Sequence, residues 1–285
     1  MTKDTPPYTL NIGGQLQSLS RPFVMGILNI TQESFYAASR SFVPEAVKLR
    51  VKEMIDEGAD IIDVGACSTK PGATPISEEE ERARLDNALS VIRKENAEIA
   101  ISVDTFRPEI AEWSIKEYGV QIINDVTGGD RENKMFETVA NLQVPYILTH
   151  SDYGTTRVNN NPVTSNRNLW KEMTYYLAER CNRLRQMGVN DVIIDPGFGF
   201  GKTLDDNYHL MAHLEDLHVL ECPILVGISR KSMIYNHLNC TPDEALNGTT
   251  ALHTIALMKG AHILRVHDVK AAVEAIHIVK KIKES

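Results

Sequence analysis

The feature that most constrains this chain is a regular alternation of short apolar segments with longer stretches of helical period. Each apolar segment is long enough for one buried strand, and several of the stretches between them end in glycine, as helices often do. Strands alternating with helices predict parallel βα units. Eight such units favour a (β/α)8 TIM barrel over the alternative, a doubly wound open sheet. The predicted strands are 23–29, 60–65, 99–104, 120–126, 144–150, 191–196, 223–229 and 262–267.

A separate segment precedes the first of these units. Residues 9–19, TLNIGGQLQSL, flank Gly13 and Gly14 with short strand-like runs, which predicts a β-hairpin. The chain has 285 residues, and α/β barrels of about 250 residues are commonly single domains. Since no proline-, glycine- or serine-rich linker divides the sequence, we predict one domain over residues 1–285.

Charge and cysteine content narrow the function classes. A formal net charge of −8 disfavours a nucleic-acid partner, because phosphate backbones bind to basic surfaces. The four cysteines include no Cys-x-x-Cys pair, so neither a zinc site nor a disulfide framework is expected. No apolar run approaches the roughly 18 residues of a membrane span, and the first residues carry no apolar targeting segment. We therefore expect a cytoplasmic protein without a membrane or nucleic-acid partner.

Residues 193–203, IIDPGFGFGKT, raise the question of a nucleotide site, because glycines shortly before Lys-Thr are typical of a P-loop. A P-loop has four residues between its first glycine and its Gly-Lys pair, whereas three residues separate Gly197 from Gly201. The position one earlier is Pro196. The spacing argues against a P-loop, so the glycines that follow Asp195 need another explanation.

Polar side chains stand at the ends of all the predicted strands, which in a barrel meet at one face. Single examples are explained by helix capping, but His150, Lys231, Arg265 and His267 are not capping residues. We therefore expect an active site formed by this set. Its members are Asn29, Asp63, Asp104, Asn124, Asp125, His150, Asp195, Ser229, Lys231, Arg265 and His267.

The carboxylates of this set, Asp63, Asp104 and Asp195, suit two kinds of ligand. One is a metal ion, and the other is a planar heterocycle with N–H donors, since a carboxylate accepts two parallel N–H bonds well. Lys231 and Arg265 argue against a wholly anionic cage and suit an oxo group and a phosphorylated substituent. The residues alone leave both interpretations open.

Seven motifs spread over residues 25–269 resemble those of dihydropteroate synthase. They are MGILNITQESF, DVGACSTKPGA, SVDT, INDVTGG, IDPGFGFGK, GISRKS and RVHDV, in chain order. The resemblance implies a TIM barrel that condenses 6-hydroxymethyl-7,8-dihydropterin pyrophosphate with p-aminobenzoate, giving 7,8-dihydropteroate and pyrophosphate in folate biosynthesis. It also implies Mg²⁺, a homodimer, and competition between sulfonamides and p-aminobenzoate. The alternatives are a pterin-binding paralogue without effective condensation, a methyltetrahydrofolate–corrinoid methyltransferase and, more distantly, a metal-dependent hydrolase.

The resemblance also implies roles for single residues. The catalytic residues would be Asp104, Lys231 and Arg265, with Asp104 stabilising the pterin-methylene cation that forms as pyrophosphate departs. Arg265 and His267 lie two positions apart, so they would point the same way and hold that pyrophosphate. The residues implied for the pterin are Asp63, Asp104, Asn124, Asp195 and Lys231, with an internal hydrogen-bonding role as the alternative for Asp63.

The same resemblance assigns the other ligands. Asn29 is the expected Mg²⁺ ligand, with substrate oxygens and water completing the coordination. Asp195 and the glycine run after it would form the pterin floor, which answers the question raised by residues 193–203. Lys202 is expected to be solvated or to tie this loop, and not to bind phosphate. The residues implied for p-aminobenzoate are Thr69, Lys70, Pro71, Phe200 and Ser232.

Two loops depart from the family pattern. Ala37 stands where the family has an aspartate, and Lys70 stands where it has an arginine. Lysine keeps the charge but lacks the two-pronged geometry of arginine, and these changes motivate the paralogue alternative. Elsewhere we expect structural roles: a hydrogen-bonded structural His150, and a solvated acidic helix face at residues 78–82, which follow a capping serine.

Overall fold

The structure is a computed structural model and describes residues 8–30, 43–67, 76–129, 134–151 and 168–285. Its central element is a sheet of eight parallel strands in the order β8-β7-β6-β5-β4-β3-β10-β9. The first and last strands of the alternation, β3 and β10, are paired, as ring formation requires. The strands are β3 (Phe23–Asn29), β4 (Ile61–Gly65), β5 (Ala100–Asp104), β6 (Ile122–Asp125), β7 (Tyr146–Thr149), β8 (Val192–Asp195), β9 (Leu225–Val226) and β10 (Ile263–Val266).

The ring closes between β8 and β9. Closure rests on a bridge between Ile194 and Ile224, next to which the Ile194 N–H donates to the Pro223 carbonyl at 2.9 Å. The predicted (β/α)8 barrel is confirmed, but the prediction of a long strand over 223–229 is wrong. Pro223 has no N–H for the ladder, and by residue 228 the backbone turns, with the Lys231 N–H donating to the Ile228 carbonyl at 3.1 Å.

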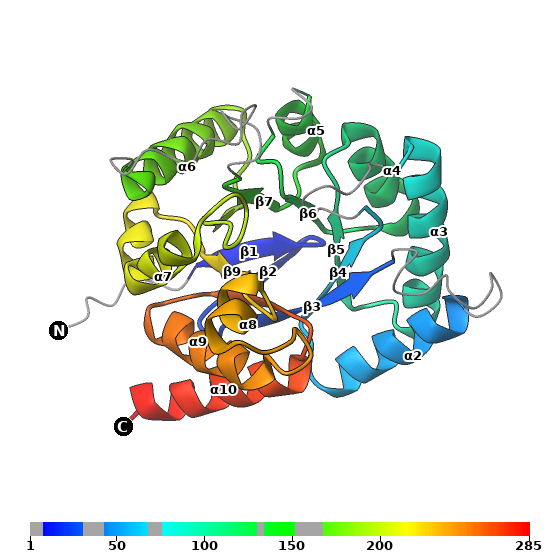
Figure 1. The fold of residues 1–285 in the computed structure, drawn as a ribbon. Helices are drawn as coiled ribbons and strands as arrows, with labels where there is room; N and C mark the ends of the chain where they lie inside the picture. The colour runs from blue at the N-terminus through cyan, green and yellow to red at the C-terminus, as the bar shows by residue number, and fades with distance from the viewer. Residues whose placement is uncertain (1–7, 31–42, 68–75, 130–133, 152–167) are drawn as a thin grey trace.

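Helices surround the barrel (Figure 1). Their ends follow local rules: Ser77 caps α3 by accepting the Glu80 N–H, and Gly119 ends α4 with a left-handed φ of 59°. None of the described helices is long and apolar enough to cross a membrane. The helices are α2 (Val43–Asp56), α3 (Glu78–Glu95), α4 (Pro108–Tyr118), α5 (Met135–Leu142), α6 (Leu169–Gln186), α7 (Leu204–Ala212), the 3-10 helix η1 (Leu214–Leu220), α8 (Ser232–Leu238), α9 (Leu246–Met258) and α10 (Val269–Lys283).

The predicted hairpin is confirmed and lies across the ring of strands (Figure 1). Its strands are β1 (Thr9–Ile12) and β2 (Gln15–Ser18), which pair antiparallel around Gly13 and Gly14. Leu10, Ile12 and Leu19 pack with apolar side chains from the barrel interior into one buried cluster. The hairpin therefore closes the amino-terminal end of the barrel. Its cluster partners are Phe23, Met25, Ile61, Ile122, Ile147, Ile193, Leu225 and Ile263.

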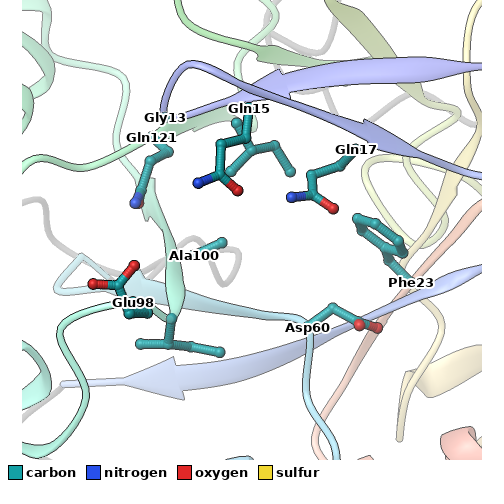
Figure 2. Close-up of a pocket in the computed structure, with 10 residues that line it drawn as sticks. Gly13, Gln15, Gln17, Phe23, Asp60, Glu98, Ala100 and Gln121 are labelled. Atoms are coloured by element: carbon teal, nitrogen blue, oxygen red, sulfur yellow. The ribbon is translucent and has the colours of Figure 1, made fainter.

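A cavity of about 250 Å³ lies between this hairpin and the barrel (Figure 2). The amides of Gln15 and Gln17 face the side where the carboxylates of Asp60 and Glu98 lie. Asp60 has a structural role, since it pairs with Arg21 and accepts the Val24 N–H at 2.8 Å. Because chemistry in barrels of this kind sits at the carboxyl ends of the strands, this cavity is on the opposite face from the expected site.

Candidate functional site

Four of the predicted site residues meet in one hydrogen-bonded cluster at the carboxyl ends of β4, β5, β6 and β10. Arg265 Nε donates to Asp63 Oδ2 at 2.6 Å, and Arg265 Nη2 donates to Asp104 Oδ2 at 2.9 Å. Asn124 Nδ2 donates to the same Asp63 oxygen at 3.1 Å. Asp63 is fully buried, and Asp104 is 9% exposed. Arg265 therefore pairs with two buried carboxylates that come from neighbouring strands.

Two members of this cluster, Asp104 and Arg265, have pKa values shifted from their ordinary values. Burial raises the pKa of Asp104 to about 7, and the charge of Asp63 adds to the effect while Arg265 opposes it. Burial also lowers the pKa of Arg265, but the two carboxylates outweigh it and raise that pKa above its ordinary value. Near neutral pH, Asp104 can therefore carry or release a proton, whereas Arg265 keeps its charge.

Asp195 ends β8 and faces the same interior. Its Oδ1 accepts the Gly197 N–H at 2.8 Å, and a methyl group at Gly227 would lie 3.7 Å from its Oδ2 and 3.9 Å from Arg265 Cβ. Burial raises the pKa of Asp195, against the opposing charge of Lys231. One carboxylate oxygen is thus fixed by the loop, and the other is on the side of Gly227 and Arg265.

The loop after Asp195 explains the glycine-rich segment. Gly197 has a φ of 69°, and a methyl group there would lie 1.9 Å from the His150 carbonyl, so only glycine fits. Lys202 Nζ donates to the Gly197 carbonyl at 2.8 Å and to the His150 carbonyl at 3.3 Å. Of the two roles expected for Lys202, the structure shows the loop-tying one. Thr203 then caps α7 with a capping box.

Lys231 lies between this loop and the carboxylates. Its Nζ donates to the Phe198 carbonyl and lies 4.6 Å from the centre of the Phe200 ring. Burial lowers the pKa of Lys231 to about 8, although the charge of Asp195 opposes the change. The structure thus brings together three predicted site residues, Asp195, Phe200 and Lys231.

His267 lies one residue beyond the end of β10. Its backbone N–H donates to Ser229 Oγ at 3.1 Å, and its Nδ1 lies 3.1 Å from the same oxygen. Burial, helped by the charge of Arg265, lowers the pKa of His267 to about 4. The imidazole is therefore neutral at physiological pH and can offer a hydrogen bond but no charge.

Of the remaining predicted site residues, some are described by the structure and some are not. Asn29 is exposed at the end of β3, and a methyl group at Gly65 would lie 3.5 Å from its Oδ1 and 3.4 Å from Asp104 Cβ. Ser232 is exposed at the start of α8. Among the described residues, no group of three or more His, Cys, Asp or Glu side chains could hold a metal ion. The positions outside the described residues are Ala37, Thr69, Lys70 and Pro71.

One expectation about the acidic helix start is wrong. Glu81 is fully buried, pairs with Arg107 and accepts the Thr105 hydroxyl at 2.7 Å. Arg107 also donates to the Ile76 carbonyl at 2.6 Å and reaches the Cys67 sulfur at 3.7 Å. Helical period could have placed residue 81 on the inner face of α3, but its partner comes from the next βα unit. This cluster braces the chain directly after Asp104.

Known proteins share this architecture and these motifs. The family described as pterin binding enzyme matches residues 25–267. A dihydropteroate synthase of Escherichia coli (strain K12) is 42% identical over 270 residues, which cover 94% of each chain. The solved dihydropteroate synthase of Yersinia pestis with a sulfonamide drug has a TM-score of 0.87 and 35% identity, covering 97% of this chain and 99% of that one.

A second solved structure agrees. The dihydropteroate synthase of Xanthomonas albilineans with 4-aminobenzoic acid has a TM-score of 0.87 and 34% identity, covering 98% of this chain and 99% of that one. The sequence matches cover most of this chain and most of each relative. Both the family match and the level of identity lead to one assignment: this chain belongs to the dihydropteroate synthases of the pterin binding enzyme family.

Proposed function

We propose that this chain joins 6-hydroxymethyl-7,8-dihydropterin pyrophosphate to p-aminobenzoate, forming 7,8-dihydropteroate and pyrophosphate. The observation that carries the proposal is the convergence of acceptors from three strands, Asp104, Asn124 and Asp195, beside the cations Lys231 and Arg265. A pterin presents several N–H donors and one oxo group in a plane. A pyrophosphate substituent adds negative charge, which suits the guanidinium.

The pterin would use acceptors that the protein has already oriented. Asp195 Oδ1 is fixed by the Gly197 N–H, so Oδ2 is left for the N–H edge of the ring. Because Asn124 donates its amide hydrogen to Asp63, its carbonyl oxygen is turned away and can accept a ring N–H. Asp63 thus acts through Asn124 and Arg265, and Lys231 would meet the oxo group.

The reaction breaks the carbon–oxygen bond to pyrophosphate, and the electron pair leaves with the pyrophosphate. The nitrogen of p-aminobenzoate then bonds to the methylene carbon and loses one proton. Positive charge develops on the pterin methylene, which favours the ionised form of Asp104. Arg265 Nη1, which donates no hydrogen bond among the described residues, would donate to an oxygen of the leaving group, with His267 supplying a second hydrogen bond from a neutral ring.

The other substrate and the metal have separate residues. We place p-aminobenzoate against Phe200 and Ser232, and against Thr69, Lys70 and Pro71, which lie outside the described residues. The exposed residue Asn29 carries an amide oxygen that would hold a Mg²⁺ ion, with water and substrate oxygens as its other ligands. When bound there, the ion would neutralise charge on the pyrophosphate. Sulfonamides would compete for the p-aminobenzoate position.

We also propose that the chain is a single-domain, cytoplasmic homodimer with small-molecule substrates and no nucleic-acid or membrane partner. A homodimer is supported by apolar side chains exposed on the adjoining helices α9 and α10. They are Ile255, Met258, Ile278 and Ile282, which are 42%, 50%, 60% and 55% exposed. Sedimentation of the wild type and of Ile278→Asp tests this, since a monomeric wild type would refute it.

The direct test is pyrophosphate release by the purified protein with Mg²⁺ and the pterin substrate, with and without p-aminobenzoate, followed by the product mass. Release that requires p-aminobenzoate and yields dihydropteroate supports the proposal. Tight pterin binding without that product would instead indicate a paralogue. Asp195→Asn should abolish pterin binding in calorimetry, because an amide N–H would replace an acceptor, and unchanged affinity would refute this assignment.

A further inference from the structure

Arg230 and Asp268 each depart from a local rule, and they do so as a pair. Arg230 has a φ of 53°, a left-handed conformation that disfavours residues with a side chain. Asp268 occupies the N-cap position of α10, where a carboxylate normally accepts a helix N–H, but its side chain makes no capping bond. The left-handed backbone of Arg230 and the missing capping bond of Asp268 both cost stability. Another interaction must therefore hold these two neighbouring loops in their conformation.

The two side chains hold each other. Arg230 Nε donates to Asp268 Oδ2 at 2.9 Å, and Arg230 Nη2 donates to Asp268 Oδ1 at 2.7 Å. This is a bidentate ion pair, the strongest geometry available to these groups. The hydrogen bonds from Arg230 hold the pKa of Asp268 below its ordinary value. The backbone N–H of Arg230 also donates to the buried Thr249 hydroxyl at 3.1 Å, which fixes the turn from a third element.

The pair lies between residues of the proposed site. Arg230 is preceded by Ser229 and followed by Lys231, while Asp268 follows His267. Since Ser229 bonds to His267 at 3.1 Å, two successive contacts join the loop after β9 to the loop after β10. Arg230 and Asp268 make the outer contact, and Ser229 and His267 make the inner one.

We propose that the Arg230–Asp268 pair is a positioning device for the reaction. It keeps Arg230 left-handed, so that the next residue, Lys231, enters the pterin site while His267 stays beside Arg265. This inference rests on the proposed function, because it concerns the same substrate. In this proposal both residues act through the neighbours that they hold, Lys231 and His267.

The test uses four variants and one matched control. Arg230→Ala removes the pair and keeps the left-handed strain, whereas Arg230→Gly removes the pair and relieves the strain. Arg230→Lys keeps the positive charge but cannot form the bidentate contact, and Asp268→Asn removes the negative charge of the partner. The control is Asp243→Asn, since Asp243 is a 97% exposed second partner of Arg230, at 3.3 Å, and lies outside the site.

We expect Arg230→Ala and Asp268→Asn to lower kcat/KM for the pterin substrate by about 10- to 100-fold in folded protein, with KM for p-aminobenzoate within about twofold. Arg230→Gly should regain roughly tenfold over Arg230→Ala, the factor expected from left-handed strain. Arg230→Lys should lie between wild type and alanine, and Asp243→Asn should stay within about twofold of wild type.

Two results would overturn the proposal. One is wild-type kcat/KM in folded Arg230→Ala or Asp268→Asn protein, which would leave the pair with stability alone. The other is equal activity of the glycine and alanine variants, which would mean that the left-handed geometry is irrelevant. If the wild type itself makes no dihydropteroate, the proposed function fails, and calorimetric affinity for the pterin substrate then tests the pair with the same variants. If Arg230→Ala does not fold, Arg230→Lys and Asp268→Asn carry the test.

Discussion

Asp104 gives the sharpest prediction, because its proposed role needs an ionised carboxylate whereas its burial opposes ionisation. Its pKa rises from 3.8 to about 7 on folding, chiefly through burial. At about 1.4 kcal/mol per pH unit, this difference of about three units means that ionising Asp104 lowers the stability of the fold by about 4 kcal/mol. Asp104→Asn removes the titration while keeping the size and one acceptor oxygen.

Stability changes with pH because the folded and unfolded chains bind the Asp104 proton differently. Between pH 4 and pH 7 the folded chain holds the Asp104 proton and the unfolded chain has lost it, so the stability contributed by this group falls as pH rises. The contribution is fully present below the unfolded pKa and is lost as pH passes through the folded pKa. About 2–3 kcal/mol of the loss should fall between pH 5 and pH 8. Over that range, Asp104→Asn should gain stability relative to the wild type by this amount.

The assay is urea unfolding of both proteins at several pH values from 5 to 8. Arg265 contacts the new amide less strongly than the carboxylate, which changes the free energy of unfolding of the variant by the same amount at every pH. Only the pH dependence of the difference between the two proteins is therefore diagnostic. Asp56→Asn, on the exposed face of α2, is the control and should follow the wild-type profile. Parallel profiles for wild type and Asp104→Asn would refute the reasoning and would mean that Arg265 keeps Asp104 ionised throughout.

Two further pairs of variants test the scaffold around the site. Gly197→Ala should destabilise the fold by about 1–3 kcal/mol more than Gly199→Ala in urea unfolding. Both positions have positive φ, but a methyl group at 197 lies 1.9 Å from the His150 carbonyl, whereas at 199 the nearest atom is 3.4 Å away. Equal losses would mean that the loop relaxes freely. Arg107→Met should lower the free energy of unfolding by about 3–5 kcal/mol because it leaves the Glu81 carboxylate buried and unpaired. Adding Glu81→Gln should recover part of this, and a single-variant loss below about 1 kcal/mol would contradict the assignment.

The barrel could be predicted from the sequence because its signal is repeated and local. Each unit carries one apolar run and one helical stretch, and parallel strands place their carboxyl ends on one face. The spacing in residues 193–203 is equally informative, since it argues against a P-loop. It is consistent with the structural role of Lys202, which donates to the Gly197 carbonyl. These inferences need only the order of residues within one unit.

The partners within the site could not be predicted in this way. Strands buried on both faces carry no alternation, so their sequence does not tell which side chains point inward. Arg265 reaches Asp63 across 202 positions, from a strand two places away in the sheet, and this depends on how the barrel closes. The partner of Glu81 was also beyond reach of the sequence, since an acidic helix start gives no sign of an arginine in the next unit.

Residues that follow local preferences for backbone conformation and helix capping have a different task from residues that depart from them. Ser77 and Thr203 cap their helices as their residue types predict, and they support the scaffold. Arg230 and Asp268 satisfy each other at the expense of backbone preference and helix capping. Such departures persist only where neighbouring contacts compensate for them, and here the bidentate pair is that compensation. A side chain held against its local preference beside Lys231 and His267 therefore indicates that the geometry of these two residues matters to the site.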